Sequence, residues 1–396
     1  MCIRDRTNTM RKKLLFLTCI AIVTICIGIL CIACGRETSV NRMGKQLYTM
    51  VELPHKVFLL DDSTTQIVNH IQTYERNDSQ LLALYNEPIN NICIFDVKSG
   101  KEIQKIQFQK EGPNALDPNF CGFLIHNKDS IFMYHTWLWQ LDLFNEKGEL
   151  QKKYQIKDYP LESGCSFRRP DILPYSDTPI KKVDNYIILQ GQGRNVCDSQ
   201  SNQIPEGVTL LLNLKDSLVR HENGYPEIYN QKGIWQTFAY RVVPYDLSPQ
   251  GEMVINYPAD DSIRVFNIHT KKTHCYFAGY SKPYTIHPAR SEKEVDRSIM
   301  EQVQYTSIYY DKWNQLYYRL LTLPLSDYDV NEKSAPKRNL AVIILDKYFQ
   351  KVGEYNIKEP SNRFSRAFVS SEGLHINILS DNDDYLTFIT VKPKKL

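Results

Sequence analysis

The chain has 396 residues, with 48 Lys and Arg against 45 Asp and Glu and a formal net charge of +3. Removing residues 1–33 takes away four net positive charges, so the remainder has a formal charge of −1. A body this close to neutral lacks the basic face that nucleic-acid binding requires, and we expect no nucleic-acid partner.

An apolar run fills residues 14–33 and follows three basic residues at 11–13. It ends with the small residue Ala33 before Cys34, which is typical of a bacterial lipoprotein signal, although Cys31 stands where a leucine is usual. An uncleaved signal anchor is the alternative, because the run is long enough to cross a bilayer core of about 30 Å as a helix. We therefore predict lipidation of Cys34 and a membrane partner through that lipid.

Five cysteines follow the predicted signal and its lipid site. They are Cys93, Cys121, Cys165, Cys197 and Cys275. Their number is odd and none forms a C-x-x-C pair, so the sequence predicts neither a disulfide framework nor a zinc knuckle, although one disulfide stays open. Cys93 and Cys275 lie in strand-like runs, where we expect small core residues.

Five segments share one pattern: an apolar strand, a polar turn and a second strand with alternating apolar positions. They begin at Ile92, Leu141, Leu210, Ile263 and Ala341. The turns at 96–100 and 145–148 contain Asp or Asn together with Gly, the residues that favour tight turns. Each segment predicts an antiparallel β-hairpin.

Short strand patterns continue to the end of the chain, and no Gly/Ser-rich or Pro-rich linker divides them. Repeated four-stranded units of about 40 to 50 residues are the blades of a β-propeller. We predict an all-β propeller of about six blades, with seven as the alternative count. Asp-Ser turns at Asp129, Asp216 and Asp261 are interpreted as a second repeated feature. A strand near residues 57–60 is expected to close the ring beside C-terminal strands at 374–379 and 385–391.

The predicted organisation has four segments. We expect residues 1–9 to be a non-native leader, because Met10 begins the basic start of the signal, and residues 10–33 to be the lipoprotein signal peptide. Residues 34–48 then hold the lipidated cysteine and a linker, and residues 49–396 form the β-propeller domain. The best helical pattern is 290–300, where Ser291 and Glu294 have the spacing of a capping box.

One block resembles a known family. Lys110-Glu111-Gly112-Pro113-Asn114, followed by GFLIHNKDSIF at 122–132, is similar to a family of Bacteroidota lipoproteins that carry domain of unknown function 4221. The order of hairpins after this block is also similar to that family and to six-bladed propeller lipoproteins. Ala115 departs from the glycine expected after the asparagine. The resemblance implies a propeller and a membrane-tethered location, and it implies no activity.

The residues after Cys34 lack the acidic run that resembles a surface-export tag in Bacteroidota lipoproteins. We therefore expect the protein in the cell envelope, lipid-anchored to the inner or outer membrane and facing the periplasm. Triplets such as Asp129-Ser130-Ile131 also resemble an O-glycosylation motif of exported Bacteroidota proteins, and strand entry explains them equally well.

The best candidate for a ligand loop is Glu111, Gly112, Pro113 and Asn114. Gly and Pro fix a loop while Glu and Asn present an acceptor and an amide, and an inter-strand turn is the alternative. Arg168 and Arg169 are a second candidate, for carboxylate or phosphate, with local pairing to a neighbouring Asp as the alternative. His126, which lies in the block at 122–132, is included among the candidate ligand-loop residues, and it could meet His135 only if the fold brings the two together.

The chain contains no G-x-S-x-G elbow, no H-E-x-x-H, no Walker loop and no dinucleotide-binding glycine pattern. Its nine histidines are scattered, so we predict no metal site and no cofactor. Tyrosines cluster between 305 and 318 with Trp313 among them, and core packing is their default interpretation.

The leading hypothesis is a membrane-anchored β-propeller that binds a protein, peptide or glycan, or acts as a scaffold, through loops on one face. The alternative is a propeller enzyme, a hydrolase or lyase, with a metal-assisted site in the central channel. Acidic and histidine side chains that converge at the channel mouth favour the enzyme, and an aromatic or apolar loop face favours the binder.

Overall fold

The computed structural model describes residues 42–117, 122–156, 171–192, 207–325 and 336–396. They belong to one compact unit, Arg42–Leu396. The predicted leader, signal and lipidation site at Cys34 lie outside the described residues. Within the described ranges, no helix has the length and hydrophobicity of a membrane span.

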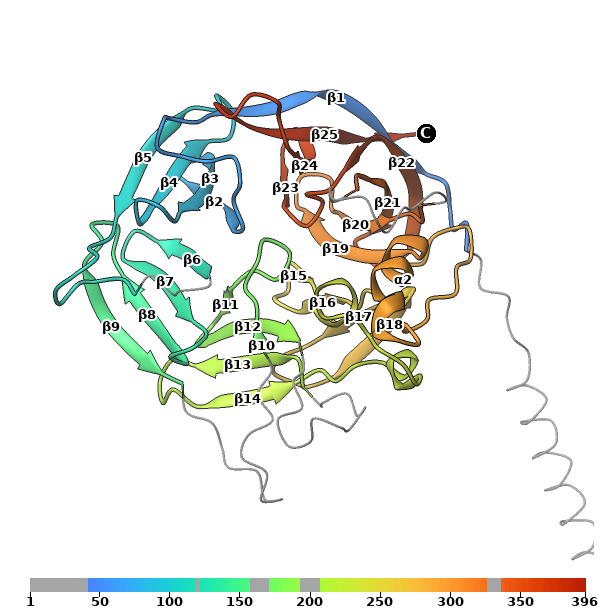
Figure 1. Ribbon diagram of the computed structural model, residues 1–396, viewed down its shortest axis with the longest axis horizontal. Coiled ribbons are helices and arrows are strands. Elements are labelled where there is room, and N and C mark those ends of the chain that lie inside the picture. Colours follow the sequence, from blue (N-terminus) through green and yellow to red (C-terminus); the bar gives the residue numbers. More distant parts are fainter. Residues whose placement is uncertain (1–41, 118–121, 157–170, 193–206, 326–335) are drawn as a thin grey trace, which may run out of the picture. The chain divides into compact units, whose positions relative to one another are not determined.

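Antiparallel groups of strands repeat around a common centre in this unit, as Figure 1 shows. The first three groups are β2 (Ile71–Arg76), β3 (Ser79–Asn86), β4 (Asn91–Asp96) and β5 (Glu102–Gln107); β6 (Gly122–Asn127), β7 (Ser130–His135), β8 (Gln140–Phe144) and β9 (Leu150–Gln155); and β10 (Asp171–Ile172), β11 (Lys181–Val183), β12 (Tyr186–Gln192), β13 (Thr209–Asn213) and β14 (Val219–Glu222). The others are β15 (Tyr245–Leu247), β16 (Met253–Asn256), β17 (Ser262–Phe266) and β18 (Thr273–Phe277); β19 (Gln304–Asp311), β20 (Leu316–Thr322), β21 (Arg338–Asp346) and β22 (Lys351–Ser361); and β23 (Ala367–Ser370), β24 (Gly373–Ile378), β25 (Tyr385–Lys395) and β1 (Tyr48–Leu59).

The last two groups form one eight-stranded sheet by hydrogen bonding. They join only between β22 and β1, through the single parallel pair Tyr48–Gly353. The described strands therefore make five hydrogen-bonded sheets but six groups around the centre. The predicted all-β propeller is confirmed, and the expected count of about six corresponds to the groups rather than to separate sheets.

The first strand closes the ring. β1 is antiparallel to β25 from Tyr48 opposite Lys395 to Leu59 opposite Tyr385. The N-terminal strand thus completes the C-terminal group, as the sequence predicted, and covers an edge that would otherwise be exposed. Phe58 locks this junction because its ring packs edge-on against Phe95 of β4, at 5.8 Å, and Phe388 of β25, at 5.7 Å.

The hydrophobic core lies between neighbouring groups of strands. Phe108, after β5, packs edge-on against Phe144 of β8 with ring centroids 5.1 Å apart, which joins the first two groups. Similar clusters of buried aliphatic and aromatic side chains fill the other junctions. Each strand group therefore buries both faces against its neighbours, which explains the apolar runs in the inner strands.

Two turn glycines permit close contact between groups. Gly100, in the β4–β5 turn, has φ of +70°, and a Cβ there would collide with the carbonyl oxygen of Val57. Gly148, in the β8–β9 turn, has φ of +73°, and a Cβ there would collide with the carbonyl oxygen of Gln107. Both turns need glycine for the positive φ and for the approach to the outer strand of the preceding group.

The connections alternate between two faces of the ring because each group is antiparallel. We call the face that carries the connections between groups, and the turns between second and third strands, the loop face. The other face, which carries the turns between first and second strands and between third and fourth strands, is the strand-turn face.

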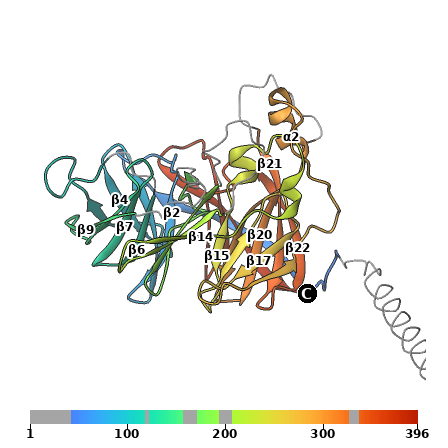
Figure 2. The ribbon, with the colours of Figure 1, turned by 90° about the horizontal axis from the view of Figure 1, so that it is seen from below.

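The connection from β18 to β19 carries the 3-10 helix η3 (Glu292–Glu294) and α2 (Val295–Glu301), and Figure 2 shows α2 standing on the loop face. The connection from β14 to β15 carries a 3-10 helix, η1 (Glu227–Asn230), and a π-helix, η2 (Thr237–Arg241).

The predicted helix at 290–300 is confirmed, but its capping box is wrong. Ser291 makes no side-chain capping bond, and the Glu294 carboxylate accepts a hydrogen bond from the backbone N–H of Arg290 at 3.3 Å. The helix therefore begins as a 3-10 turn. All five predicted hairpins are present, each as the last two strands of a group.

Two other interpretations need correction. Cys93 is buried in β4 as expected, whereas Cys275 is exposed because β18 is an outermost strand. The Asp-Ser turns are not equivalent: Asp129 precedes the second strand of its group, Asp261 the third strand of its group, and Asp216 the last strand of its group. They mark turns in general and not one repeated position.

Candidate functional site

The inner strand of the third group is interrupted. β10 and β11 both pair with β12, and residues 173–180 leave the sheet between them. Pro174 and Pro179 lie within this excursion, and because proline has no N–H it cannot complete the ladder. In Figure 1 the green segment before β11 extends into the centre of the ring. We call residues 173–180 the channel segment.

Hydrogen bonds hold the channel segment to strands of several groups. The Ser176 hydroxyl oxygen accepts from the N–H of Ile71 at 3.1 Å, and the Asp177 carbonyl accepts from the N–H of Tyr245 at 3.2 Å. The Tyr245 hydroxyl donates to the carbonyl of Pro179 at 2.7 Å. The segment therefore lies fixed across the channel and separates its two ends.

His70 anchors the start of the channel segment. Its Nδ1 lies within hydrogen-bonding distance of the carbonyl oxygen of Pro174, and its Nε2 lies 3.0 Å from the carbonyl oxygen and 3.4 Å from the backbone nitrogen of Phe123. Burial lowers the pKa of His70 to about 4, so the imidazole is neutral at physiological pH. This neutral imidazole joins the first and second groups to the channel segment.

Three adjoining cavities cross the loop-face end of the channel. The first, about 370 Å³, is lined by residues including Ile67, Asn69 and Tyr175. The second, about 230 Å³, shares Asn69 and Tyr175 with the first and adds Asp177 and Phe238. The third, about 310 Å³, shares Asp177 and Phe238 with the second. We call these three the mouth cavities.

Asp177 lies at the base of the second and third mouth cavities. Its side chain is 9% exposed, and its Oδ1 has no hydrogen-bond partner. Burial raises the pKa of Asp177 to about 7, although the positive charge of Arg366 acts in the opposite direction. This carboxyl is the most strongly perturbed acid that lines these cavities, and such groups occur preferentially at functional sites.

Arg366 lines the second mouth cavity beside Asp177. Its Nη2 donates to Asn69 Oδ1 at 2.8 Å, while its buried Nε has no partner. Burial lowers the pKa of the guanidinium. The cavity thus holds an acid and a base that both retain unused hydrogen-bonding capacity.

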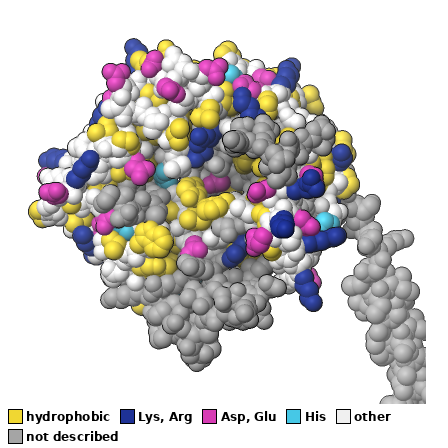
Figure 3. All heavy atoms as spheres, in the orientation of Figure 1, with side chains coloured by type: hydrophobic (Ala, Val, Ile, Leu, Met, Phe, Trp, Pro, Cys, Tyr) yellow, Lys and Arg dark blue, Asp and Glu magenta, His cyan; other side chains and the backbone are white. Residues whose placement is uncertain are grey.

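Hydrophobic side chains surround this end of the channel. Large exposed examples in loop-face connections are Trp137 at 80%, Phe238 at 62% and Ile67 at 57%. Figure 3, which views this face, shows hydrophobic side chains both at its centre and nearer its rim. Ile67 and Phe238 line the mouth cavities, whereas Trp137 does not, and apolar side chains beside a few buried polar groups are the usual composition of a binding site.

The strand-turn end of the channel holds a separate cavity of about 310 Å³. Its charged lining residues are paired: Lys312 with Glu75, and Lys181 with Asp246 at 3.3 Å. Trp313 stands at its edge, 41% exposed. The charged groups here pair with one another, unlike Asp177 at the opposite end, although the buried hydroxyl of Tyr309 has no hydrogen-bond partner.

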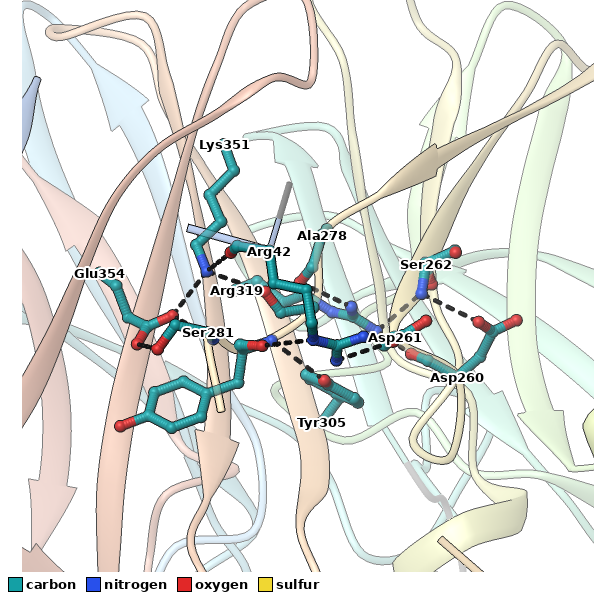
Figure 4. A network of polar contacts seen from close by, with 12 residues as sticks. Arg42, Asp260, Asp261, Ser262, Ala278, Ser281, Tyr305, Arg319, Lys351 and Glu354 are labelled. Carbon is teal, nitrogen blue, oxygen red and sulfur yellow. Dashed lines mark hydrogen bonds and ion pairs between the residues drawn. The ribbon is translucent and has the colours of Figure 1, made fainter. Parts of the chain in front are cut away.

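A second polar cluster is structural, as Figure 4 shows. The fully buried guanidinium of Arg319 donates to Asn256 Oδ1 at 2.7 Å and to the carbonyls of Ala278, at 3.0 Å, and Asp260, at 2.6 Å. It also lies 3.8 Å from the ring centroid of Tyr305. This cation is compensated by carbonyls and an aromatic face, and it joins the fourth and fifth groups.

A buried Ser-His pair in the last group resembles a nucleophile and its base. Ser370 Oγ lies 2.7 Å from His375 Nε2, and His375 Nδ1 lies 3.0 Å from Thr390 Oγ1. Ser370 is only 1% exposed, and burial lowers the pKa of His375 to about 3. A base this weak does not activate a hydroxyl at neutral pH, so the pair is structural.

The predicted ligand loop lies away from the channel cavities. Glu111, Gly112 and Pro113 are exposed between β5 and β6, and Asn114 Oδ1 accepts from the N–H of Leu150 at 3.2 Å. Gly112 has φ of +91°, and its carbonyl accepts from the N–H of the third residue after it at 3.1 Å. The geometry is that of the inter-strand turn, and the loop's role as a ligand site stays a prediction.

The other predicted residues do not join this loop. His126 is exposed at the end of β6, and burial lowers its pKa with a smaller effect from Lys182. His135 is buried and pairs with Asp142, with 3.2 Å between Nε2 and Oδ2. Arg168 and Arg169 lie outside the described residues. In the described part of the chain, no three His, Cys, Asp or Glu side chains gather as metal ligands would.

Sequence reasoning missed Asp177, Arg366 and Phe238. The two prolines that bracket Tyr175-Ser176-Asp177-Thr178 were an available signal, since they interrupt an otherwise strand-like stretch. Core packing, the default interpretation of the tyrosine cluster, is confirmed for Tyr305, Tyr317 and Tyr318, which are buried, but not for Trp313, which is 41% exposed.

Comparison with known proteins identifies the family. The model of the family described as "Domain of unknown function (DUF4221)" matches residues 49–356. The chain belongs to this family. The resemblance drawn from the block around Glu111 is therefore confirmed, and no curated relative matches the chain.

Solved structures of similar proteins agree with the fold. A DUF4221 family member from Bacteroides vulgatus is 22% identical with a TM-score of 0.73, and the match covers 89% of this chain and all of that one. A putative exported protein from Bacteroides fragilis is 12% identical with a TM-score of 0.52, covering 91% of this chain and 98% of the other. At these identities the likeness concerns the fold alone.

Proposed function

We propose that this DUF4221 protein is a lipid-anchored binding module of the cell envelope that holds an extended ligand, a peptide or protein segment, across its loop face. The observation that carries the proposal is the row of three adjoining mouth cavities, which runs from Ile67 to Phe238 over the channel segment. Cavities of 230 to 370 Å³ each suit single side chains, and three in a row suit a chain of residues.

The composition of the mouth cavities favours a peptide. Exposed Phe238 and Ile67 provide apolar contact area, while Asp177 and Arg366 provide groups of opposite charge between them. A glycan is the other ligand class from the sequence analysis, and the exposed Trp137 on the same face is its best support. The proposal commits to the peptide because Asp177 and Arg366 both line the second cavity, at the centre of the row.

The anchoring part of the proposal rests on Cys34 and the apolar run before it. The similar Bacteroides fragilis protein bears the description "putative exported protein", which agrees with an exported location here. Expression of the full chain and of Cys34→Ser in a bacterial host tests this part. We expect the unchanged chain in the membrane fraction with the mass of added acyl chains, and the variant without them; identical masses would contradict lipidation.

The binding part is tested by screening the detergent-solubilised chain against peptide and glycan arrays, followed by calorimetry. Phe238→Ser is expected to weaken the binding of a selected peptide at least tenfold, because it removes an aromatic contact from two mouth cavities. Trp137→Ser is the matched control, since Trp137 is exposed on the same face but does not line these cavities. Equal weakening by both variants, or selection of glycans alone, would contradict the peptide proposal.

A further inference from the structure

Two residues that line the third mouth cavity have buried oxygen atoms without hydrogen-bond partners. Asp177 Oδ1 and Thr306 Oγ1 both lack a hydrogen bond, and their residues, 9% and 3% exposed, line the same cavity of about 310 Å³. Native proteins leave few buried polar atoms unsatisfied, and such atoms beside a cavity indicate water or a ligand. Both oxygens can accept hydrogen bonds.

The walls of this cavity are mostly apolar. They include Phe238, Ala239, Val242, Ile299 and Phe364. None of the described residues that line the cavity is basic, so no protein cation competes for the carboxylate from inside it. Arg366 lines the neighbouring cavity, and its Nη2 is engaged by Asn69.

We infer that the third mouth cavity binds a primary ammonium group carried on an apolar stem. This inference rests on the proposed function and names the part of the peptide that the cavity takes. An ammonium group has three N–H donors, which can be shared between Asp177 Oδ1 and Thr306 Oγ1 with one left for solvent or the ligand itself. The apolar walls fit the methylene stem.

Two parts of a peptide have this chemistry, a lysine side chain and an N-terminal residue. Nα-acetyl-lysine methylamide presents the first, and phenylalaninamide presents the second. Nα,Nε-diacetyl-lysine methylamide has the same stem without the charge. Calorimetry or saturation-transfer NMR with the detergent-solubilised full chain at pH 8 measures each probe.

We expect one or both amines to bind and the diacetylated probe to bind at least tenfold more weakly. Asp177→Asn is expected to weaken the binding of the amines at least tenfold, and Thr306→Val is expected to weaken it several-fold. Asp129→Asn, in an exposed turn on the strand-turn face, is the control and should leave the affinity unchanged. Thermal melting checks that each variant is folded. The preferred amine identifies the source of the ammonium group.

Two outcomes would overturn the inference. Either no amine binds, or Asp177→Asn binds the amines as well as the unchanged chain does. Neither outcome decides the proposed function. The proposed function is judged by whether Phe238→Ser weakens the binding of an array-selected peptide. If Phe238→Ser abolishes this binding and Asp177→Asn leaves it unchanged, the proposed function holds and the ammonium site is ruled out.

Discussion

Asp177 and Arg366 line the same cavity at the loop-face end of the channel but do not form an ion pair. The channel segment carries Asp177, and the Arg366 guanidinium is held by Asn69 through a hydrogen bond of 2.8 Å. Both side chains are largely removed from water, and each retains an atom without a partner. Such an arrangement costs folding free energy, which is common where a site is kept ready for a ligand.

Replacing Asp177 should stabilise the protein at high pH. Because the pKa of Asp177 is about 7 in the folded state and near 3.8 when unfolded, the unchanged protein loses stability as the pH rises from 4 through 7. Asp177→Asn removes this loss, so its advantage should grow from near zero below pH 4 to as much as about 4 kcal/mol at pH 8. Urea unfolding across this range measures the difference, with Asp129→Asn as the control; a constant difference would contradict the buried carboxylate.

His70 should produce the opposite dependence. Its pKa falls to about 4 on folding from 6.5, so the stability that it contributes is complete above pH 6.5 and is lost as the pH falls through 4. The loss should approach about 3 kcal/mol. His70→Gln should flatten thermal melting against pH between 6.5 and 4. The same change at His274, which is exposed, should leave the profile as it is.

Gly122 tests the position of the channel segment. A Cβ at this residue would lie 2.6 Å from both the carbonyl oxygen and Cγ of Pro174. Gly122→Ala should therefore cost about 1 to 3 kcal/mol in urea unfolding. Gly224→Ala is the matched control, because nothing lies within 4 Å of its Cβ, and it should change stability by less than about 1 kcal/mol. If both variants unfold alike, Pro174 does not pack against β6.

Ring closure by β1 predicts losses of stability of very different size at two adjacent positions. Phe58 is fully buried among aromatic rings, whereas Leu59 is 54% exposed. Phe58→Ala should cost about 3 to 5 kcal/mol, and Leu59→Ala about 0.5 kcal/mol or less. Denaturant midpoints give both values. Similar losses at the two positions would show that β1 does not pair with β25 in the observed register.

The parts of the fold that were predicted correctly depend on local sequence. Alternation after Ile92 and the Asp and Gly residues of the following turn specify a hairpin without reference to the rest of the chain. The closing strand was also accessible, because residues 57–60 are strand-like and the C-terminal strands needed a partner. Cys275 was misplaced because a strand-like run does not reveal whether the strand is inner or outermost in its group.

The candidate site was not predictable in this way. Asp177 comes from the channel segment, whereas Phe238 and Arg366 come from two connections between groups, and the three meet only because the ring brings these segments to one mouth. The loop at Glu111 was favoured because its residue types suit a ligand loop, but the same types suit the turn that the structure shows. Only the prolines at 174 and 179 gave a local sign that the third group is interrupted.

Hydrogen exchange of the free and ligand-bound protein tests the central claim most directly. An array-selected ligand should slow exchange in peptides covering residues 67–71, 173–180, 236–243 and 364–367, which surround the mouth cavities. Residues 74–76 and 311–316, at the strand-turn end, should be unaffected. Protection confined to the strand-turn end, or to the loop at 111–114, would contradict a binding site at the loop-face mouth.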